Sequence, residues 1–153
     1  MKNKKCLIVG AYPKGPIFGG FVRDCEMLKL SNLYTDYEVI INIQGDEPLI
    51  EGNMIDSLIA PFKEEKDLVM ATLKHKMDTI EEVENPNNVK VITDKSDYAI
   101  YFSRSPIPYP RELDMSNYYK HVGIYGYKRD FVMEYSTMAP TSLEVSESLE
   151  QLR

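Results

Sequence analysis

Residues 39–50, VIINIQGDEPLI, contain the pattern that decides the fold class of this chain. Residues 39–43 are mostly apolar and β-branched, which is typical of a strand buried on both faces of a sheet. The run then stops at Gln44, and QGDEP adds a glycine and two carboxylates. In open parallel sheets, ligands bind beyond the carboxyl ends of the strands. We therefore expect a functional site where this strand ends.

Outward from this stretch, short apolar runs alternate with segments of helical period. We expect strands at 5–10, 39–43, 68–73, 89–93, 98–103 and 121–128, and helices at 21–34, 50–66, 130–138 and from 142, with Ser142 as the cap. The alternation predicts an α/β fold whose sheet is mostly parallel, Rossmann-like and flanked by helices. DKSD between 89–93 and 98–103 predicts an antiparallel hairpin as an extension of that sheet.

Length and composition limit the class of protein. At 153 residues we expect one domain, in which an atypical strand, loop and helix at 1–38 precede a core at 39–153. The net charge of −6 and the lack of a basic run argue against nucleic acid as a partner. No apolar stretch approaches the ~20 residues that a membrane-spanning helix needs. Cys6 and Cys25 suggest neither a zinc site nor a disulfide scaffold, and we expect a cytoplasmic protein.

QGDEP itself has two chemical interpretations. Gly45 permits a tight turn, Asp46 can bind a hard divalent cation, and Gln44 can donate a hydrogen bond to a sugar or base oxygen. Acidic residues after a strand are also common helix N-caps, so Asp46 or Glu47 can instead cap the helix after Pro48. The local pattern leaves both interpretations open.

Further candidate residues lie in the second half of the chain. Arg104 stands where a strand enters the proline-rich loop SPIPYP, and its guanidinium could bind a carboxylate through two hydrogen bonds. The alternative is an ordinary surface arginine. His121 can equally be a hydrogen-bonded histidine at a strand end, Tyr125 a core residue, and Glu150 and Gln151 part of a solvated helix face.

Five motifs in a fixed order carry a resemblance to a known family: INIQGDEPLI, NVKVITD, YAIYFSRSPIPYPR, KHVGIYGYKRDF and SLEVSESLEQLR. Over about residues 38–153 the chain resembles the 3-deoxy-D-manno-octulosonate cytidylyltransferases, or CMP-Kdo synthetases. The resemblance implies a nucleotide-diphospho-sugar transferase-like fold and a homodimer. It also implies coupling of CTP to the acidic sugar Kdo, with release of pyrophosphate and with Mg²⁺, for lipopolysaccharide or capsule synthesis.

The same resemblance implies roles for individual residues. Asp46 is expected to be the catalytic metal ligand, and the sugar is expected to contact Gln44, Arg104, His121, Tyr125, Glu150 and Gln151. These residue types suit a ligand with a carboxylate and many hydroxyls.

Two departures from the family pattern weaken the expected activity. The family begins with a nucleotide-binding loop of the type IPARYxSxRxPGK, and residues 1–38 contain nothing like it. The family also has a GVDTP-type motif, with a second metal-binding aspartate, beyond the point where this chain stops. We therefore expect a fold that is incomplete at both ends and an impaired enzyme. The alternatives are a non-catalytic module for acidic-sugar binding or assembly, or a glycosyltransferase fragment, since residues 5–21 weakly resemble the N-terminus of such enzymes.

Overall fold

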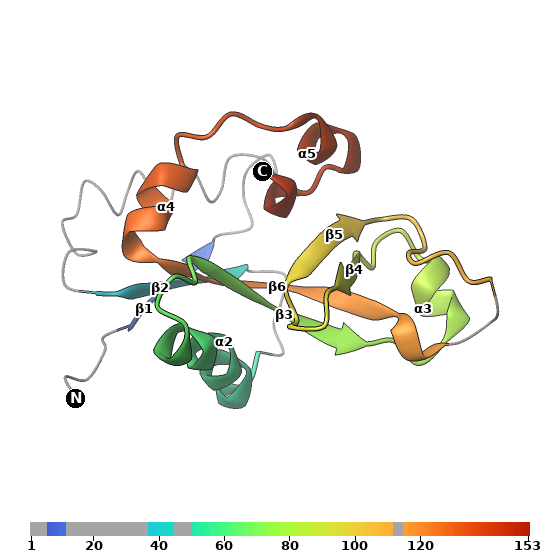
Figure 1. The fold of residues 1–153 in the computed structure, drawn as a ribbon, viewed down its shortest axis with the longest axis horizontal. Helices are drawn as coiled ribbons and strands as arrows, with labels where there is room; N and C mark the ends of the chain where they lie inside the picture. Colours follow the sequence, from blue (N-terminus) through green and yellow to red (C-terminus); the bar gives the residue numbers. More distant parts are fainter. Residues whose placement is uncertain (1–5, 12–36, 45–49, 112–114) are drawn as a thin grey trace. The chain divides into compact units, whose positions relative to one another are not determined.

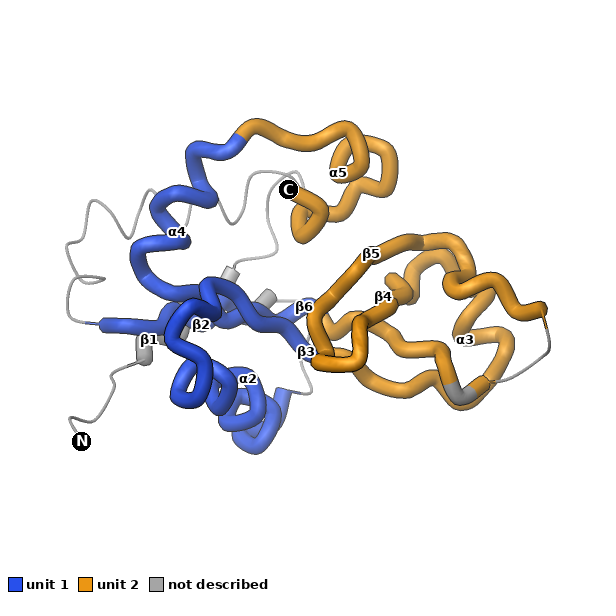
Figure 2. Tube along the Cα trace, in the orientation of Figure 1, with its two compact units in different colours: residues 1–73, 123–138 blue, residues 74–122, 139–153 orange. Residues whose placement is uncertain are grey.

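The computed structural model describes residues 6–11, 37–44, 50–111 and 115–153. The chain divides into two compact units (Figure 2). Unit 1 comprises Met1–Leu73 and Gly123–Met138, and unit 2 comprises Lys74–Val122 and Ala139–Arg153. The expected single domain over 1–153 stays a prediction. The helix expected at 21–34 lies outside the described residues.

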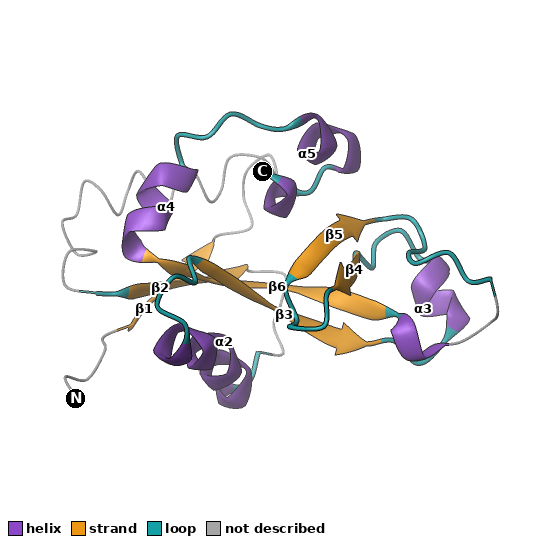
Figure 3. Cartoon of the chain, in the orientation of Figure 1, coloured by secondary structure: helices purple, strands orange, loops and turns teal. Residues whose placement is uncertain are grey.

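Strands and short helices alternate along the described residues (Figures 1 and 3). In chain order they are β1 (Cys6–Ala11), β2 (Val39–Gln44), α2 (Gly52–Glu64), β3 (Met70–Lys76), α3 (Ile80–Glu84), β4 (Lys90–Thr93), β5 (Ala99–Ser103), η2 (Met115–Asn117), β6 (Tyr119–Lys128), α4 (Arg129–Tyr135), α5 (Ser142–Glu147) and η3 (Glu150–Leu152). This confirms the expected α/β class and most of the expected elements.

The strand directions differ from the sequence-based expectation. β1 and β2 are parallel, whereas β2 and β6, β4 and β5, and β4 and β6 are antiparallel. The expectation of a mostly parallel sheet is therefore not confirmed. A β-branched run reports that a strand is buried on both faces, and it carries no information about the direction of its neighbours.

Unit 1 packs a helix on each face of β2 (Figure 1). Successive side chains of a strand point to opposite faces, so Ile40 and Ile41 serve different helices. Ile40 lies in a buried cluster with Val132 and Tyr135 of α4. On the other face, Ile41 and Gly126 lie against α2, whose buried residues are Leu58 and Phe62. The helical period expected for 50–66 is thus confirmed as the buried stripe of α2.

Unit 2 is built around the expected hairpin of β4 and β5. The strands pair with Lys90 opposite Ser103, and β4 also pairs with β6. The Asp94 carboxylate accepts hydrogen bonds from the N–H groups of Ser96 and Tyr98, which closes the turn. Asp97 in that turn has φ 64°, in the left-handed region that aspartate tolerates better than most residues. DKSD therefore forms a hairpin turn, as expected.

The last helical segment is capped one residue earlier than expected. The N-cap of α5 is Thr141, whose hydroxyl accepts from the Glu144 N–H, while the Glu144 carboxylate accepts from the Thr141 N–H. Ser142 is the first helical residue, so its assignment as the cap is wrong. The reciprocal pair formed by Thr141 and Glu144 is a capping box, which Ser142 cannot form with the residue three positions later.

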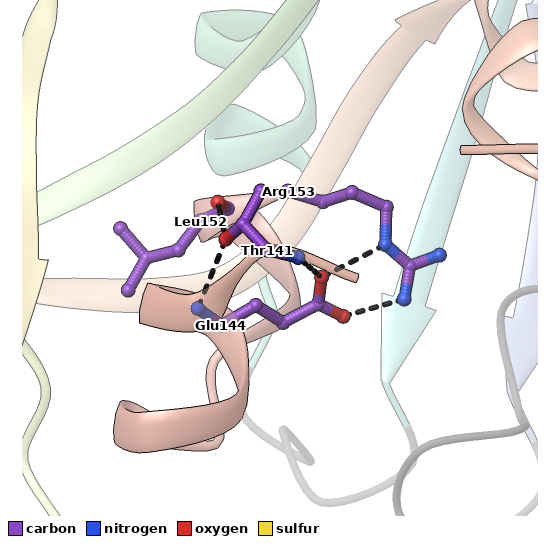
Figure 4. A network of polar contacts seen from close by, with 4 residues as sticks. All are labelled: Thr141, Glu144, Leu152 and Arg153. Atoms are coloured by element: carbon purple, nitrogen blue, oxygen red, sulfur yellow. Dashed lines mark hydrogen bonds and ion pairs between the residues drawn. The ribbon is translucent and has the colours of Figure 1, made fainter. Parts of the chain in front are cut away.

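The segment that follows α5 folds back on the cap (Figure 4). Ser148 takes up a left-handed conformation (φ 54°) and ends the helix, and η3 follows. The Thr141 hydroxyl donates to the carbonyl of Leu152 at 2.7 Å, and the Arg153 guanidinium donates to both oxygens of Glu144. The Glu144 side chain is 1% exposed and the Arg153 side chain 7%, so this ion pair is buried.

Candidate functional site

The carboxyl ends of β1 and β2 coincide in unit 1. The two strands are parallel, and their final residues Ala11 and Gln44 are in register. Gln44 therefore stands at the sheet edge where ligands bind in folds of this kind. Asp46 follows it in sequence, but residues 45–49 lie outside the described residues. The N-cap position of α2 belongs to Glu51, so neither Asp46 nor Glu47 occupies it.

Tyr125 lies on the same face of unit 1 as the side chain of Asn42. The two residues are directly opposite each other in the antiparallel pair of β2 and β6. Tyr125 is buried, and its ring stacks on that of Tyr127 with centroids 5.9 Å apart. Tyr125 is therefore packed as a core residue, the alternative that the sequence left open.

Arg104 lies in unit 2, directly after β5, and its guanidinium binds backbone carbonyl groups. Nε donates to the carbonyl of Glu147 at 2.8 Å, Nη2 to that of Ser148 at 3.4 Å, and Nη1 to that of Pro86 at 3.1 Å. These contacts fix the plane of the guanidinium. Because an arginine has about five N–H donors, Arg104 has further donors beyond the three that these described residues bind.

Glu147 forms the other half of this arrangement. Its Oε1 accepts from the hydroxyls of Ser103 (2.6 Å) and Tyr101 (3.2 Å), and its Oε2 accepts from the backbone N–H of Arg104 (2.9 Å). Partial burial of the carboxylate favours its neutral form, but these hydrogen bonds and the Arg104 charge outweigh burial and lower the pKa of Glu147. Glu147 is therefore a carboxylate that holds the end of α5 onto the end of β5.

A buried lysine, Lys90, also binds the backbone at Arg104. Lys90 of β4 is fully buried, and its ammonium donates to the carbonyls of Asn85 and Arg104. Burial lowers the pKa of Lys90, the Arg104 charge acts in the same direction, and the Glu147 charge opposes both. The backbone of Arg104 is thus held at its N–H by Glu147 and at its carbonyl by Lys90.

His121 lies on β6 within unit 2 and is buried. Its ring meets the Phe102 ring edge to face, with centroids 5.1 Å apart and an interplanar angle of 82°. Its backbone N–H donates to the carbonyl of Val89. Burial lowers the pKa of His121 to about 4, so its imidazole is neutral at pH 7. A neutral imidazole offers one donor and one acceptor, which suits a hydroxyl-rich ligand.

Glu150 and Gln151 lie in η3, two residues beyond the left-handed Ser148. Burial raises the pKa of Glu150; the nearby charge of Arg153 opposes this and that of Glu144 adds to it. Leu149, just before η3, packs in one buried cluster with Phe102. Phe102 of β5 therefore contacts His121 and shares a buried cluster with Leu149, the residue before Glu150. Arg104, His121, Glu150 and Gln151 all belong to unit 2.

The comparison with known families covers most of the chain. Residues 14–153 match the family model described as cytidylyltransferase. The chain belongs to the cytidylyltransferase family. The match begins well before the motifs that carried the sequence resemblance, which start near residue 38.

The curated relatives of this chain are named as cytidylyltransferases too. This chain is 71% identical over 119 residues to the 3-deoxy-manno-octulosonate cytidylyltransferase of Fusobacterium nucleatum, covering 78% of this chain and 49% of that protein. It is 50% identical over 127 residues to the enzyme of the same name from Geobacter sulfurreducens, covering 76% of this chain and 51% of the relative. The chain spans about half the length of the curated relatives it matches.

A solved structure shares the fold. It is described as CMP:2-keto-3-deoxy-manno-octonic acid synthetase complexed with CTP. The match has a TM-score of 0.77 and 40% sequence identity, and it covers 86% of this chain and 53% of the other. Resemblance to the CMP-Kdo synthetases, which the sequence motifs indicated, is therefore confirmed.

No metal-binding cluster can be assigned in the described part of this chain. Residues 6–11, 37–44, 50–111 and 115–153 contain no group of three or more His, Cys, Asp or Glu side chains placed to hold a metal ion. Asp46, the expected ligand, lies within residues 45–49, outside the described residues.

In the described residues, no helix is long and apolar enough to cross a membrane.

Two polar residues were not singled out from the sequence, Asn42 of unit 1 and Glu147 of unit 2. Asn42 is buried, and its Oδ1 has no hydrogen-bond partner among the described residues. A polar residue two positions before Gln44 on an alternating strand was a usable signal. Glu147 lies three positions after Glu144 on α5, a spacing that puts both carboxylates on one side of the helix. The same spacing also occurs on ordinary solvated faces.

Proposed function

We propose that this chain takes part in cytidylyl transfer from CTP to Kdo, giving CMP-Kdo and pyrophosphate. The observation that carries the proposal is the 40% identical structural match to a synthetase for this sugar nucleotide in complex with CTP. The names of the curated relatives support the same activity. In this proposal, unit 2 supplies most of the residues that bind the acceptor sugar.

Each proposed sugar contact has a chemical reason. The carboxylate of Kdo binds the remaining N–H donors of Arg104, whose guanidinium is already oriented by three carbonyl groups. Neutral His121, Glu150 and Gln151 are proposed to contact sugar hydroxyls, because these residue types pair with hydroxyl groups as donors or acceptors. Gln44 and Tyr125 of unit 1 are proposed as further sugar contacts.

The proposed reaction needs positioning more than covalent chemistry from the protein. The anomeric hydroxyl oxygen of the sugar attacks the α-phosphorus of CTP and loses its proton, a new O–P bond forms, and the bond from the α-phosphorus to the β-phosphate oxygen breaks to release pyrophosphate. A bound carboxylate fixes the rotation of the sugar, so Arg104 sets where the attacking oxygen lies. Neutral His121 leaves the cationic role at this end of the site to Arg104.

We further propose Asp46 as a ligand of Mg²⁺, which would offset phosphate charge when bound. The proposal is supported by the register of Ala11 and Gln44 at the ends of two parallel strands, just before Asp46 in sequence, and by Glu51 as the N-cap of α2. Carboxylate oxygens are the protein ligands that Mg²⁺ prefers.

A homodimer and a cytoplasmic location complete the proposal. Tyr98, Ile100 and Tyr109 of unit 2 are at least half exposed, and apolar side chains of this size suit contact with a second copy. Sedimentation velocity of the chain should give a dimer mass. We propose a cytoplasmic location because the proposed reaction consumes CTP, and fractionation of the cells would test it.

Isothermal calorimetry with three ligands tests the proposed function. We expect heat of binding with Kdo, little or none with a Kdo analogue whose carboxylate is reduced to an alcohol, and heat with CTP in the presence of Mg²⁺. Binding of Kdo without binding of CTP would favour the alternative of a non-catalytic acidic-sugar module. Heat with neither ligand would contradict both functions.

A further inference from the structure

The loop that presents Arg104 and the turn that presents Glu150 and Gln151 are joined by a single side chain. Glu147 ends α5, three residues before Glu150. Its carboxylate binds the end of β5 through the Ser103 hydroxyl and the Arg104 N–H. The two segments are therefore tied together by contacts far apart in sequence.

Arg104 and Glu147 each bind the backbone of the other through their side chains. The guanidinium Nε of Arg104 donates to the carbonyl of Glu147, and Nη2 donates to the carbonyl of Ser148. The side chain of Glu147 thus fixes the backbone of Arg104, while the backbone of Glu147 fixes the side chain of Arg104. Without the carboxylate, the carbonyls of Glu147 and Ser148 would be held to the end of β5 by the guanidinium alone, and the backbone of Arg104 would lose its bond to Glu147.

Both oxygens of the Glu147 carboxylate are engaged within unit 2. Each of its oxygens accepts at least one hydrogen bond from β5 or from the residue after it. Charge-assisted hydrogen bonds of this kind are short and directional. Glu147 is consequently poorly suited to contact a ligand, and well suited to hold other groups in place.

We infer that Glu147 is a positioning residue of the acidic-sugar site, which acts by orienting Arg104 relative to Glu150 and Gln151. The inference deepens the proposed function and rests on it for the identity of the ligand. It adds a residue that touches no substrate, yet whose loss should weaken carboxylate recognition. A positioning role requires that loss of Glu147 changes the orientation of Arg104. A purely structural role would not require this change.

The experiment combines Kdo calorimetry with ¹⁵N NMR of the Arg104 Nε–H on the same variants. We expect Glu147→Ala to lower Kdo affinity about tenfold, the loss of about one charge-assisted hydrogen bond. We also expect the Arg104 Nε–H signal, assigned with Arg104→Lys, to shift and exchange faster with solvent. Glu147→Gln keeps the shape and an acceptor oxygen, so it should retain most of the affinity and of the signal. Glu84→Gln on the exposed face of α3 is the matched control and should change neither.

Each outcome bears on the inference. Wild-type affinity in Glu147→Ala would overturn it, and so would weakened binding with an unchanged Arg104 signal, because Glu147 would then act by another route. If Glu147→Ala does not fold, Ser103→Ala removes the 2.6 Å anchor of the carboxylate and should give the same two changes at smaller size. If the wild-type chain binds no Kdo, the proposed function fails, while the NMR signal still decides whether Glu147 orients Arg104.

Discussion

Arg104 and Glu147 hold each other across 43 positions of sequence. The backbone N–H of Arg104 donates to the Glu147 carboxylate, and the guanidinium Nε donates to the Glu147 carbonyl. This reciprocal contact joins the strand end that carries the proposed carboxylate-binding arginine to the turn that carries Glu150 and Gln151. The arrangement of Arg104 relative to this turn therefore depends on backbone contacts as well as on side chains.

The close packing of α2 on the sheet predicts a cost for enlarging Gly126. A Cβ at this position would lie 2.9 Å from Cε2 of Phe62 and 3.3 Å from Cδ1 of Ile41. Because buried rings and methyl groups have little room to shift, Gly126→Ala should destabilise the chain by about 1–3 kcal/mol. Thermal and urea unfolding would measure this change.

Gly52 at the start of α2 provides the matched control. A Cβ there would meet nothing within 4 Å. Gly52→Ala should leave the free energy of unfolding within about 0.5 kcal/mol of wild type. Equal melting temperatures for the two variants would show that α2 does not pack on Gly126.

The buried ion pair between Glu144 and Arg153 predicts a large loss when one partner is removed. Glu144→Leu leaves the Arg153 guanidinium buried without its carboxylate and also removes half of the capping box. The expected cost is about 3–5 kcal/mol, measured by urea unfolding.

A double variant separates the ion pair from packing. Glu144→Leu combined with Arg153→Met removes both charges, so it should be less destabilised than Glu144→Leu alone. Strictly additive effects of the two substitutions would mean that the charges do not interact energetically.

Burial of His121 predicts a loss of stability in mild acid. The pKa of His121 is lowered to about 4 in the folded chain, whereas an unfolded histidine titrates near 6.5. Between these values the unfolded state binds more protons, so this contribution is complete above pH 6.5 and is lost as the pH falls toward 4. At pH 5 the loss amounts to about 2 kcal/mol.

The His121 prediction is checked by comparing variants across pH. The free energy of unfolding of His121→Leu should fall less between pH 7 and pH 5 than that of wild type. His75→Leu, at an exposed position of β3, should keep the wild-type dependence. Parallel curves for wild type and His121→Leu would contradict a buried neutral imidazole.

Local patterns were sufficient for most of the described elements and for the hairpin of β4 and β5, but not for the pairing of strands far apart in sequence. The apolar period of 50–66 predicted the α2 stripe of Leu58 and Phe62, and DKSD predicted the turn between β4 and β5. The antiparallel direction of β2 and β6 depends on pairing between residues such as Asn42 and Tyr125, far apart in sequence. The Thr141 cap had a readable signal, because Thr141 and Glu144 have the spacing of a capping box.

The candidate site also contains residues that the sequence indicated and one that it did not. Arg104, His121, Glu150 and Gln151 were named from the sequence and all belong to unit 2, and their binding roles stay predictions. The carboxylate that orients Arg104 was missed, since nothing local to SLEVSE distinguishes Glu147 from a solvated glutamate. Asp46 remains a prediction from sequence, because residues 45–49 lie outside the described structure.

The most direct test of the account is the dissociation constant for Kdo of wild type, Arg104→Ala and Lys95→Ala, measured by calorimetry under identical salt and pH. Lys95 is an exposed cation in the hairpin turn, so Lys95→Ala removes one positive charge without touching the proposed site. The account predicts that Arg104→Ala weakens binding about 10- to 100-fold, the loss of a charge-assisted contact, while Lys95→Ala binds as wild type does. Equal affinities for all three proteins would contradict the claim that Arg104 recognises the carboxylate of the sugar.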